Sequence, residues 1–121
     1  MTCDNWQVVV VPFPFTDRTT TRRRPALVLS AKAFNRHGHS VLAMITAAAH
    51  QPWPGDTALA GLKSAGLRTP SLVRLKLFTL DNRFIARRIG TLGSPDQASV
   101  AEHMRAFLPV LAEIGEEHRR E

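Results

Sequence analysis

Three consecutive arginines stand directly before a proline and an apolar run, in the segment Arg22-Arg23-Arg24-Pro25. Each guanidinium is a planar fork that can bind a phosphate through two parallel hydrogen bonds. Where a strand begins, three such groups can meet the phosphate backbone of a nucleic acid. The alternative is a solvated basic loop without a ligand. This segment is therefore the first candidate site, and its expected ligand is phosphate.

Two other side chains are candidates for a site of this kind. Thr46 closes a predicted strand over 41–45 and offers a hydroxyl, although β-propensity alone explains most threonines in strands. Trp53 lies between two prolines, where its indole either caps the core or stacks on a base. Both residues have a structural explanation as well as a functional one.

Three histidines in predicted turns and loops form another group. His37 and His39 flank one glycine, and with His50 they can make a metal site or an acid–base pair. Turn histidines are more often simply exposed, so we expect neither a metal nor a cofactor.

Familiar catalytic and nucleotide-binding motifs are absent from the sequence. It contains no G-x-S-x-G, no P-loop and no G-x-G-x-x-G. The acidic residues before position 95 occur singly, which gives weak support to paired-carboxylate or two-metal chemistry. They are Asp4, Asp17, Asp56 and Asp81.

The charge is distributed unevenly along the 121 residues. Thirteen of the sixteen basic residues are arginine. Residues 1–95 hold thirteen basic and four acidic side chains, a net charge of +9, whereas residues 96–121 hold three basic and six acidic ones, a net charge of −3. A basic body suggests a polyanionic partner, and the alternative is a solvated arginine-rich surface.

The elements that must position these residues are mostly short strands, followed by a C-terminal helix. Strands are predicted at 8–11, 26–29, 41–46 and 71–79 and within 84–92, with a weak one at 57–60 and a polar loop over 16–24. In the longest strand, one face is predicted to carry Leu72, Arg74, Lys76 and Phe78.

The pattern changes at residues 93–95, where Ser94 is a suitable N-cap and Pro95 a suitable first helical residue. An apolar stripe from Val100 to Ile114 then recurs at helical spacing, and Pro109 predicts a kink or two short helices. We expect one domain over 1–121, with a strongly curved sheet or barrel at about 6–92 and a helix at about 95–118.

Size, cysteine content and hydropathy exclude several protein classes. A chain of 121 residues suits one domain, and the single Cys3 excludes an internal disulfide and a cysteine zinc site. No run approaches the ~18 apolar residues of a membrane span, and no secretory signal is visible. We expect a cytoplasmic protein without a membrane partner.

Two motifs near the N-terminus stand close together: VVVVPFPFTD at 8–17 and RPALVLS at 24–30. Ile45-Thr46, WPGD at 53–56, PSLVR at 70–74 and LFTLD at 77–81 follow in order. This series resembles the MazF/PemK family, the endoribonuclease toxins of type II toxin–antitoxin pairs. It covers about residues 6–92, and its first two motifs together are the specific part.

The resemblance implies a small SH3-like β-barrel with a C-terminal helix, of the MazF/PemK/CcdB kind, and a homodimer. It places the family's catalytic arginine at Arg24 and its catalytic threonine at Thr46. A serine that lies near that site in relatives is here Ser71. Further candidates for supporting the site or binding substrate are Arg22, Arg23, Trp53 and Arg74.

Members of the family cut single-stranded RNA without a metal, through attack of the substrate's own 2′-hydroxyl on the phosphorus. That reaction needs alignment and stabilisation of a phosphorane's negative charge, with no protein nucleophile. Arg24 can supply the charge and Thr46 a hydroxyl donor, while His37, His39 and His50 remain open as general bases. The resemblance also implies growth inhibition and a cognate acidic antitoxin.

One departure from the family's pattern is visible, and two alternative functions stay open. Many relatives carry Gly-Asp before the first strand, where this chain has Trp6-Gln7. The first alternative is a non-catalytic toxin of the same fold that acts on a protein target such as DNA gyrase, the CcdB type. The joint presence of Arg24, Thr46 and Ser71 argues against it. The second is a nucleic-acid-binding barrel that does not cut.

Overall fold

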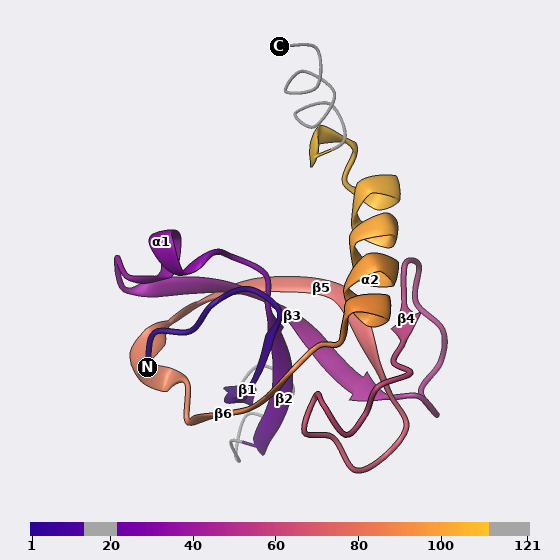
Figure 1. Ribbon diagram of the computed structural model, residues 1–121, viewed down its shortest axis with the longest axis horizontal. Helices are drawn as coiled ribbons and strands as arrows, with labels where there is room; N and C mark the ends of the chain where they lie inside the picture. The colour runs from indigo at the N-terminus through magenta and orange to yellow at the C-terminus, as the bar shows by residue number, and fades with distance from the viewer. Residues whose placement is uncertain (14–21, 112–121) are drawn as a thin grey trace.

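The computed structural model describes residues 1–13 and 22–111, which form a curved, six-stranded antiparallel sheet with a helix at its C-terminal end (Figure 1). The order of strands across the sheet is β4-β5-β3-β2-β1-β6. The strands are β1 (Gln7–Phe13), β2 (Arg22–Val28), β3 (His39–Ala47), β4 (Thr57–Ala58), β5 (Ser71–Asp81) and β6 (Arg87–Thr91). The helices are α1 (Lys32–Asn35), the 3-10 turn η1 (Asn82–Phe84) and α2 (Ser94–Phe107). A mainly β fold with a C-terminal helix is thereby confirmed.

Strand β1 lies inside the sheet, between β2 and β6, because its four valines can be buried on both faces. Neighbouring side chains of a strand point to opposite faces. Val8 accordingly joins one apolar cluster, which includes Val100 of α2, and Val9 joins a second cluster, which includes Cys3. The sheet thus has apolar contacts on both sides.

The three arginines before Pro25 are the first residues of β2, so the predicted loop over 16–24 is wrong for its last three positions. They pair with the end of β1, where Val11 is opposite Arg24 and Pro12 is opposite Arg23. Pro12 lacks only its N–H and keeps its carbonyl, which is why β1 continues through it at this point. The rest of that loop lies outside the described residues.

Buried and exposed side chains do not alternate regularly along β5, contrary to the prediction. The pairing of β5 with β3 shifts register between Ala43 and Met44, which are opposite Leu77 and Arg74 respectively. A bulge of this kind re-aims the side chains around it. Leu77, next to this shift, is 41% exposed, although simple alternation places it on the same face as the buried Val73.

The segment between β4 and β5 closes one side of the curved sheet by packing against β6. The backbone N–H of Thr91 donates to the Ser64 carbonyl across 2.9 Å. Gly66 has φ +74, and a Cβ there would lie 2.1 Å from the Ile89 carbonyl oxygen. A Cβ on Gly90 would lie 2.4 Å from the Ser64 oxygen. Two glycines thus allow the backbones of this segment and β6 to approach closely.

Helix α2 begins at Ser94, one residue earlier than predicted, with Gly93 rather than Ser94 as its N-cap and Pro95 in the first turn. Buried Asp96 accepts hydrogen bonds from the backbone N–H groups of Ala60 and Gly61, at 3.0 and 2.9 Å. Those bonds fix the start of the helix to the segment after β4. In Figure 1 the helix rises from the sheet at β4 and β5, so its later turns project beyond it.

The predicted interruption near Pro109 is confirmed. Leu108 leaves helical geometry, with φ −126 and ψ 74, and residues 109–111 form a separate helical turn. The rest of the predicted helix, 112–118, lies outside the described residues. No helix in the described residues is long and apolar enough to span a membrane.

The N-terminal segment is anchored by backbone and polar contacts that the sequence did not predict. Asn35 of α1, itself not predicted, is fully buried and donates to the Cys3 carbonyl across 2.8 Å. Burial raises the pKa of the Cys3 thiol, so it stays protonated at neutral pH. Trp6 has φ +69, a left-handed backbone conformation that favours glycine.

Candidate RNA-cleavage site

Arg24, Thr46 and Ser71 lie in one surface pocket of about 190 Å³, although they are far apart in the sequence. Arg24 is near the start of β2, Thr46 near the end of β3, and Ser71 begins β5. The pairing of β3 with β5 brings Thr46 and Ser71 together, because Thr46 pairs with Leu72 and Ala47 pairs with Ser71. The other lining residues are Pro25, Ile45, Ala47, His50, Leu67 and Thr69.

The Arg24 guanidinium has no carboxylate partner among the described residues. Its Nε atom is buried and has no hydrogen-bond partner in that part of the chain. Buried polar atoms without a partner are uncommon in folded proteins, and they often mark sites that bind an anion or a water molecule. Arg24 therefore brings a positive charge with an unused donor into the pocket.

The Thr46 side chain is buried and already oriented by a neighbour. Its Oγ1 lies 2.6 Å from Nδ1 of His50, which is exposed and four residues further along the chain. A neutral imidazole can accept a proton at this nitrogen, and the opposite tautomer can donate one. Of the three candidate histidines, His50 is the one that reaches the pocket. His37 and His39 lie at the opposite end of β3.

Ser71 contributes mainly to the shape of the pocket. Its hydroxyl donates to the Thr69 carbonyl across 2.8 Å, and its side chain is buried. This bond fixes the turn through Pro70 that leads into β5. The serine oxygen can still accept one hydrogen bond from a ligand.

Arg74 and Asp56 form a two-bond ion pair beneath the loop that follows β3. Arg74 donates through Nε and Nη2 to the carboxylate of Asp56, at 3.1 and 3.0 Å. Nη2 also donates to the carbonyl of Gln51, the residue after His50, across 2.7 Å. The Arg74 side chain is therefore occupied in holding this loop, which carries His50.

The Trp53 indole lies over the same ion pair, 41% exposed. Its ring centre is 5.8 Å from the Arg74 guanidinium carbon and 4.9 Å from the Lys76 amine. Such contacts between cations and an indole ring stabilise the loop. The indole thus covers the ion pair rather than lining the Arg24 pocket.

Because β2 is extended, the other two arginines of the Arg22-Arg23-Arg24-Pro25 segment have different surroundings from each other. Arg23 lines a neighbouring pocket together with Arg24, whereas Arg22 is exposed at the strand's first position. Three arginines of that neighbouring pocket, Arg68, Arg87 and Arg88, were not predicted as site residues. The high net charge was the only signal for them, since the contact between their segments depends on the glycines described above.

No group of three or more histidine, cysteine, aspartate or glutamate side chains in residues 1–13 and 22–111 is arranged to hold a metal ion. The polar side chains that line the pocket are instead one guanidinium, three hydroxyls and one imidazole.

A family model of the PemK-like, MazF-like toxins of type II toxin–antitoxin systems matches residues 4–108. The chain belongs to this family. The resemblance deduced from the motifs is thereby confirmed, and the match includes Arg24, Thr46, His50 and Ser71. No curated protein gives a significant match to the sequence.

Solved structures of MazF toxins share the fold. A chain of the MazE–MazF complex from Deinococcus radiodurans is 22% identical with a TM-score of 0.71, over 90% of this chain and 98% of its own. The Mycobacterium tuberculosis toxin MazF-mt6 is 20% identical with a TM-score of 0.67, over 83% and 93%. An endoribonuclease in complex with its cognate antitoxin, from a mycobacterial species, is 18% identical with a TM-score of 0.68, over 88% and 95%.

Proposed function

We propose that this toxin is an endoribonuclease that cuts single-stranded RNA by attack of the 2′-hydroxyl on the adjacent phosphorus. The observation that carries the proposal is the meeting of Arg24 with Thr46 and His50, from two distant parts of the chain, around one surface pocket. The solved structures that share the fold include an endoribonuclease, which supports the same activity.

The proposed roles follow from the chemistry of each group. In the transition state the phosphorus carries five oxygens and extra negative charge, which the Arg24 guanidinium stabilises. The Thr46 hydroxyl donates to one of these oxygens, and His50 fixes the direction of that hydroxyl. The nucleophile belongs to the RNA, so the products are a 2′,3′-cyclic phosphate and a 5′-hydroxyl, and the reaction requires no metal.

His50 is proposed as a positioning residue with access to a proton. His50→Ala is expected to slow cleavage about tenfold, since a single directed hydrogen bond is lost. His50→Asn, which keeps a polar group near the Nδ1 position, should recover part of this rate.

Cleavage rates of the three proteins on the same RNA check this role. If His50→Ala retains the parent rate, then His50 is an exposed loop residue without a part in the reaction.

We further propose that a cognate acidic antitoxin neutralises the toxin by covering Arg24 and Thr46, and that free toxin inhibits growth in the cytoplasm. The related Deinococcus radiodurans structure contains MazE with MazF, and the mycobacterial endoribonuclease is bound to its cognate antitoxin. The excess of arginine on the body suits an acidic partner that folds as it binds.

A homodimer is proposed through an apolar surface at the end of α2. Val100 and Met104 of the predicted stripe pack on the sheet, whereas Phe107 is 53% exposed. A Cβ on Gly55 would be 2.5 Å from Cδ1 of Leu75 and 3.2 Å from Cδ2 of Phe107, so Phe107 at the helix end and Leu75 of β5 both lie beside Gly55. Other exposed apolar residues in these elements and the turn beyond α2 are Leu77, Val110 and Leu111.

Light scattering at micromolar concentration should give the mass of a dimer for the parent protein. Phe107→Asp should give a monomer, because a charge replaces an apolar contact of the interface. Phe34→Asp is the matched control, since Phe34 is 52% exposed on α1, which is remote from this surface in Figure 1. A monomeric parent, or a Phe107→Asp protein that stays dimeric, would refute the proposed interface.

The activity itself is tested by incubating the purified protein with single-stranded RNA in excess chelator. Cleavage is expected, and Arg24→Ala prepared in the same way excludes a contaminating nuclease. RNA that is bound but left intact would favour a non-cleaving barrel. A protein that ignores RNA but inhibits DNA gyrase would favour the non-catalytic toxin.

A further inference from the structure

A second and larger pocket, of about 650 Å³, adjoins the Arg24–Thr46 pocket. The two pockets share Arg24, Pro25 and Leu67 as lining residues, so they are neighbours on the surface. No residue in the described part of the chain contributes a carboxylate to the lining of the larger pocket. Five of its ten lining residues are arginines: Arg23, Arg24, Arg68, Arg87 and Arg88.

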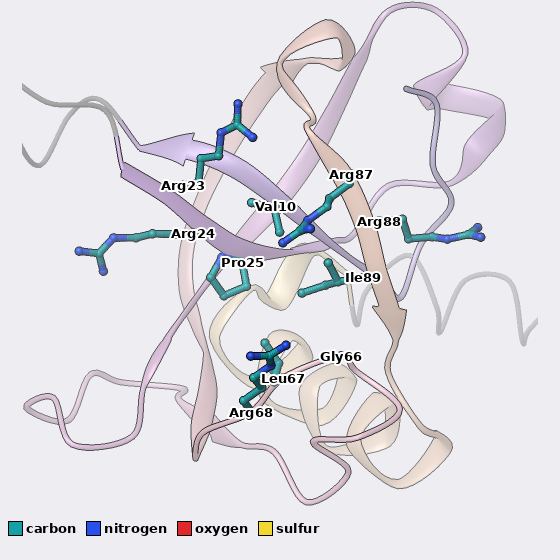
Figure 2. Close-up of a pocket in the computed structure, with 10 residues that line it drawn as sticks. All are labelled: Val10, Arg23, Arg24, Pro25, Gly66, Leu67, Arg68, Arg87, Arg88 and Ile89. Atoms are coloured by element: carbon teal, nitrogen blue, oxygen red, sulfur yellow. The ribbon is translucent and has the colours of Figure 1, made fainter.

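The positive charges of this arginine pocket are not neutralised within the described residues. The ion pairs there involve Arg74 and Arg83, and neither lines the pocket. Figure 2 shows Arg87 over the pocket near Val10 and Arg68 beside Leu67, whereas the side chains of Arg23, Arg24 and Arg88 extend outward from it. The uncompensated Arg87 and Arg68 guanidiniums at one hollow repel each other, and an anion between them removes that repulsion.

An exposed aromatic ring lies beyond the arginine pocket. A third hollow, of about 420 Å³, is lined by Arg23, which it shares with the arginine pocket, and by Phe84. Phe84 is 50% exposed, and the Arg83 guanidinium carbon lies 5.3 Å from its ring centre. An exposed ring held beside cationic groups is the usual platform for a base of single-stranded nucleic acid.

We propose that the arginine pocket and Phe84 bind the RNA strand where it continues away from the scissile phosphate. Arg87 and Arg68 bind backbone phosphates, and Phe84 stacks on a base. This proposal rests on the proposed function, because an RNA strand that binds at Arg24 is thereby placed beside the residues that the two pockets share. RNA is favoured over an acidic protein segment because the hollows offer guanidiniums and an aromatic face in succession, which match alternating phosphates and bases.

The test is the affinity for a single-stranded RNA of mixed sequence and about 16 nucleotides, methylated at every 2′-oxygen so that it cannot be cut. Fluorescence anisotropy is recorded over a series of salt concentrations. Arg87→Ala should weaken binding about tenfold and make the salt dependence shallower, by about 0.7 in the slope for each phosphate that the variant no longer binds. Phe84→Ala should weaken binding several-fold, with the slope unchanged, since stacking releases no counterions.

Matched controls separate the proposed sites from overall charge and overall apolar surface. Arg36→Ala and Phe34→Ala alter exposed residues of the same kinds that line none of these pockets, and both should bind RNA as the parent does. Equal losses from Arg36→Ala and Arg87→Ala would overturn the proposal, since they would show non-specific attraction. Parent-like binding by folded Arg87→Ala and Phe84→Ala proteins would also overturn it.

Failure here is distinguishable from failure of the proposed function. A protein that cuts natural RNA while Arg87→Ala binds the methylated strand normally refutes the arginine pocket alone. A protein that binds the methylated strand through Arg87 but cuts no natural RNA refutes the proposed cleavage alone. If Arg87→Ala loses binding of a polyglutamate peptide and keeps RNA binding, the pocket is a protein-docking site and the proposal is wrong.

Discussion

Arg24→Ala is expected to lower the rate of RNA cleavage by about 10²–10³, because it removes the charge that stabilises the phosphorane. Within the described residues this guanidinium has no carboxylate partner, and its buried Nε has no hydrogen-bond partner. Its removal should therefore cost little stability. A cleavage time course measures the rate, and circular dichroism measures the fold.

Two further variants define what Arg24 supplies. Arg24→Lys keeps a positive charge but loses the planar fork, so it should fall between the parent and Arg24→Ala. Arg36→Ala makes the same change in net charge at an exposed position outside the pockets, and it should cut as the parent does. A folded Arg24→Ala protein that cuts at the parent rate would remove Arg24 from the site.

Thr46→Val is expected to lower the rate about tenfold to hundredfold with little change in RNA affinity. The substitution keeps the β-branched shape that suits β3 and removes the one hydroxyl that is 2.6 Å from His50. A donor that acts mainly on the transition state affects kcat more than KM. Steady-state kinetics on a short RNA separates the two constants.

Thr79→Val is the matched control for Thr46→Val. Thr79 is an exposed threonine of β5, opposite Val41 at the far end of the ladder from Thr46. The Thr79→Val substitution should leave both kcat and KM unchanged. An unchanged kcat for Thr46→Val would mean that Thr46 serves the strand alone, as its β-propensity already explains.

Much of the fold was predictable because it depends on local patterns. The valine run of β1, the turn at Gly38 and the interruption at Pro109 follow from residue preferences over a few positions. The bulge opposite Ala43 was not predictable, because it arises from how two strands meet. Helix α1 was missed because four residues give too few turns for a periodic pattern.

The candidate site likewise has a part that was predictable from the sequence and a part that was not. The motifs pointed to Arg24, Thr46 and Ser71, and the structure places them around one pocket. Arg74 was assigned to the site by its motif, yet its side chain is bound by Asp56 and a loop carbonyl. The choice of His50 among three histidines, and the approach of Arg68 to Arg87, depend on contacts between distant segments that no local spacing encodes.

The central claim is that this toxin cuts RNA by using the substrate's own 2′-hydroxyl at the Arg24–Thr46 pocket. The most direct measurement is mass spectrometry of the products from a cleavable RNA in excess chelator, beside the same RNA with 2′-deoxyribose on the 5′ side of the cut bond. The expected result is a 2′,3′-cyclic phosphate (or its hydrolysed 3′-phosphate) and a 5′-hydroxyl from the first RNA, with no cut at the deoxy position of the second. Cleavage at the deoxy position, or products with a 5′-phosphate, would contradict the claim.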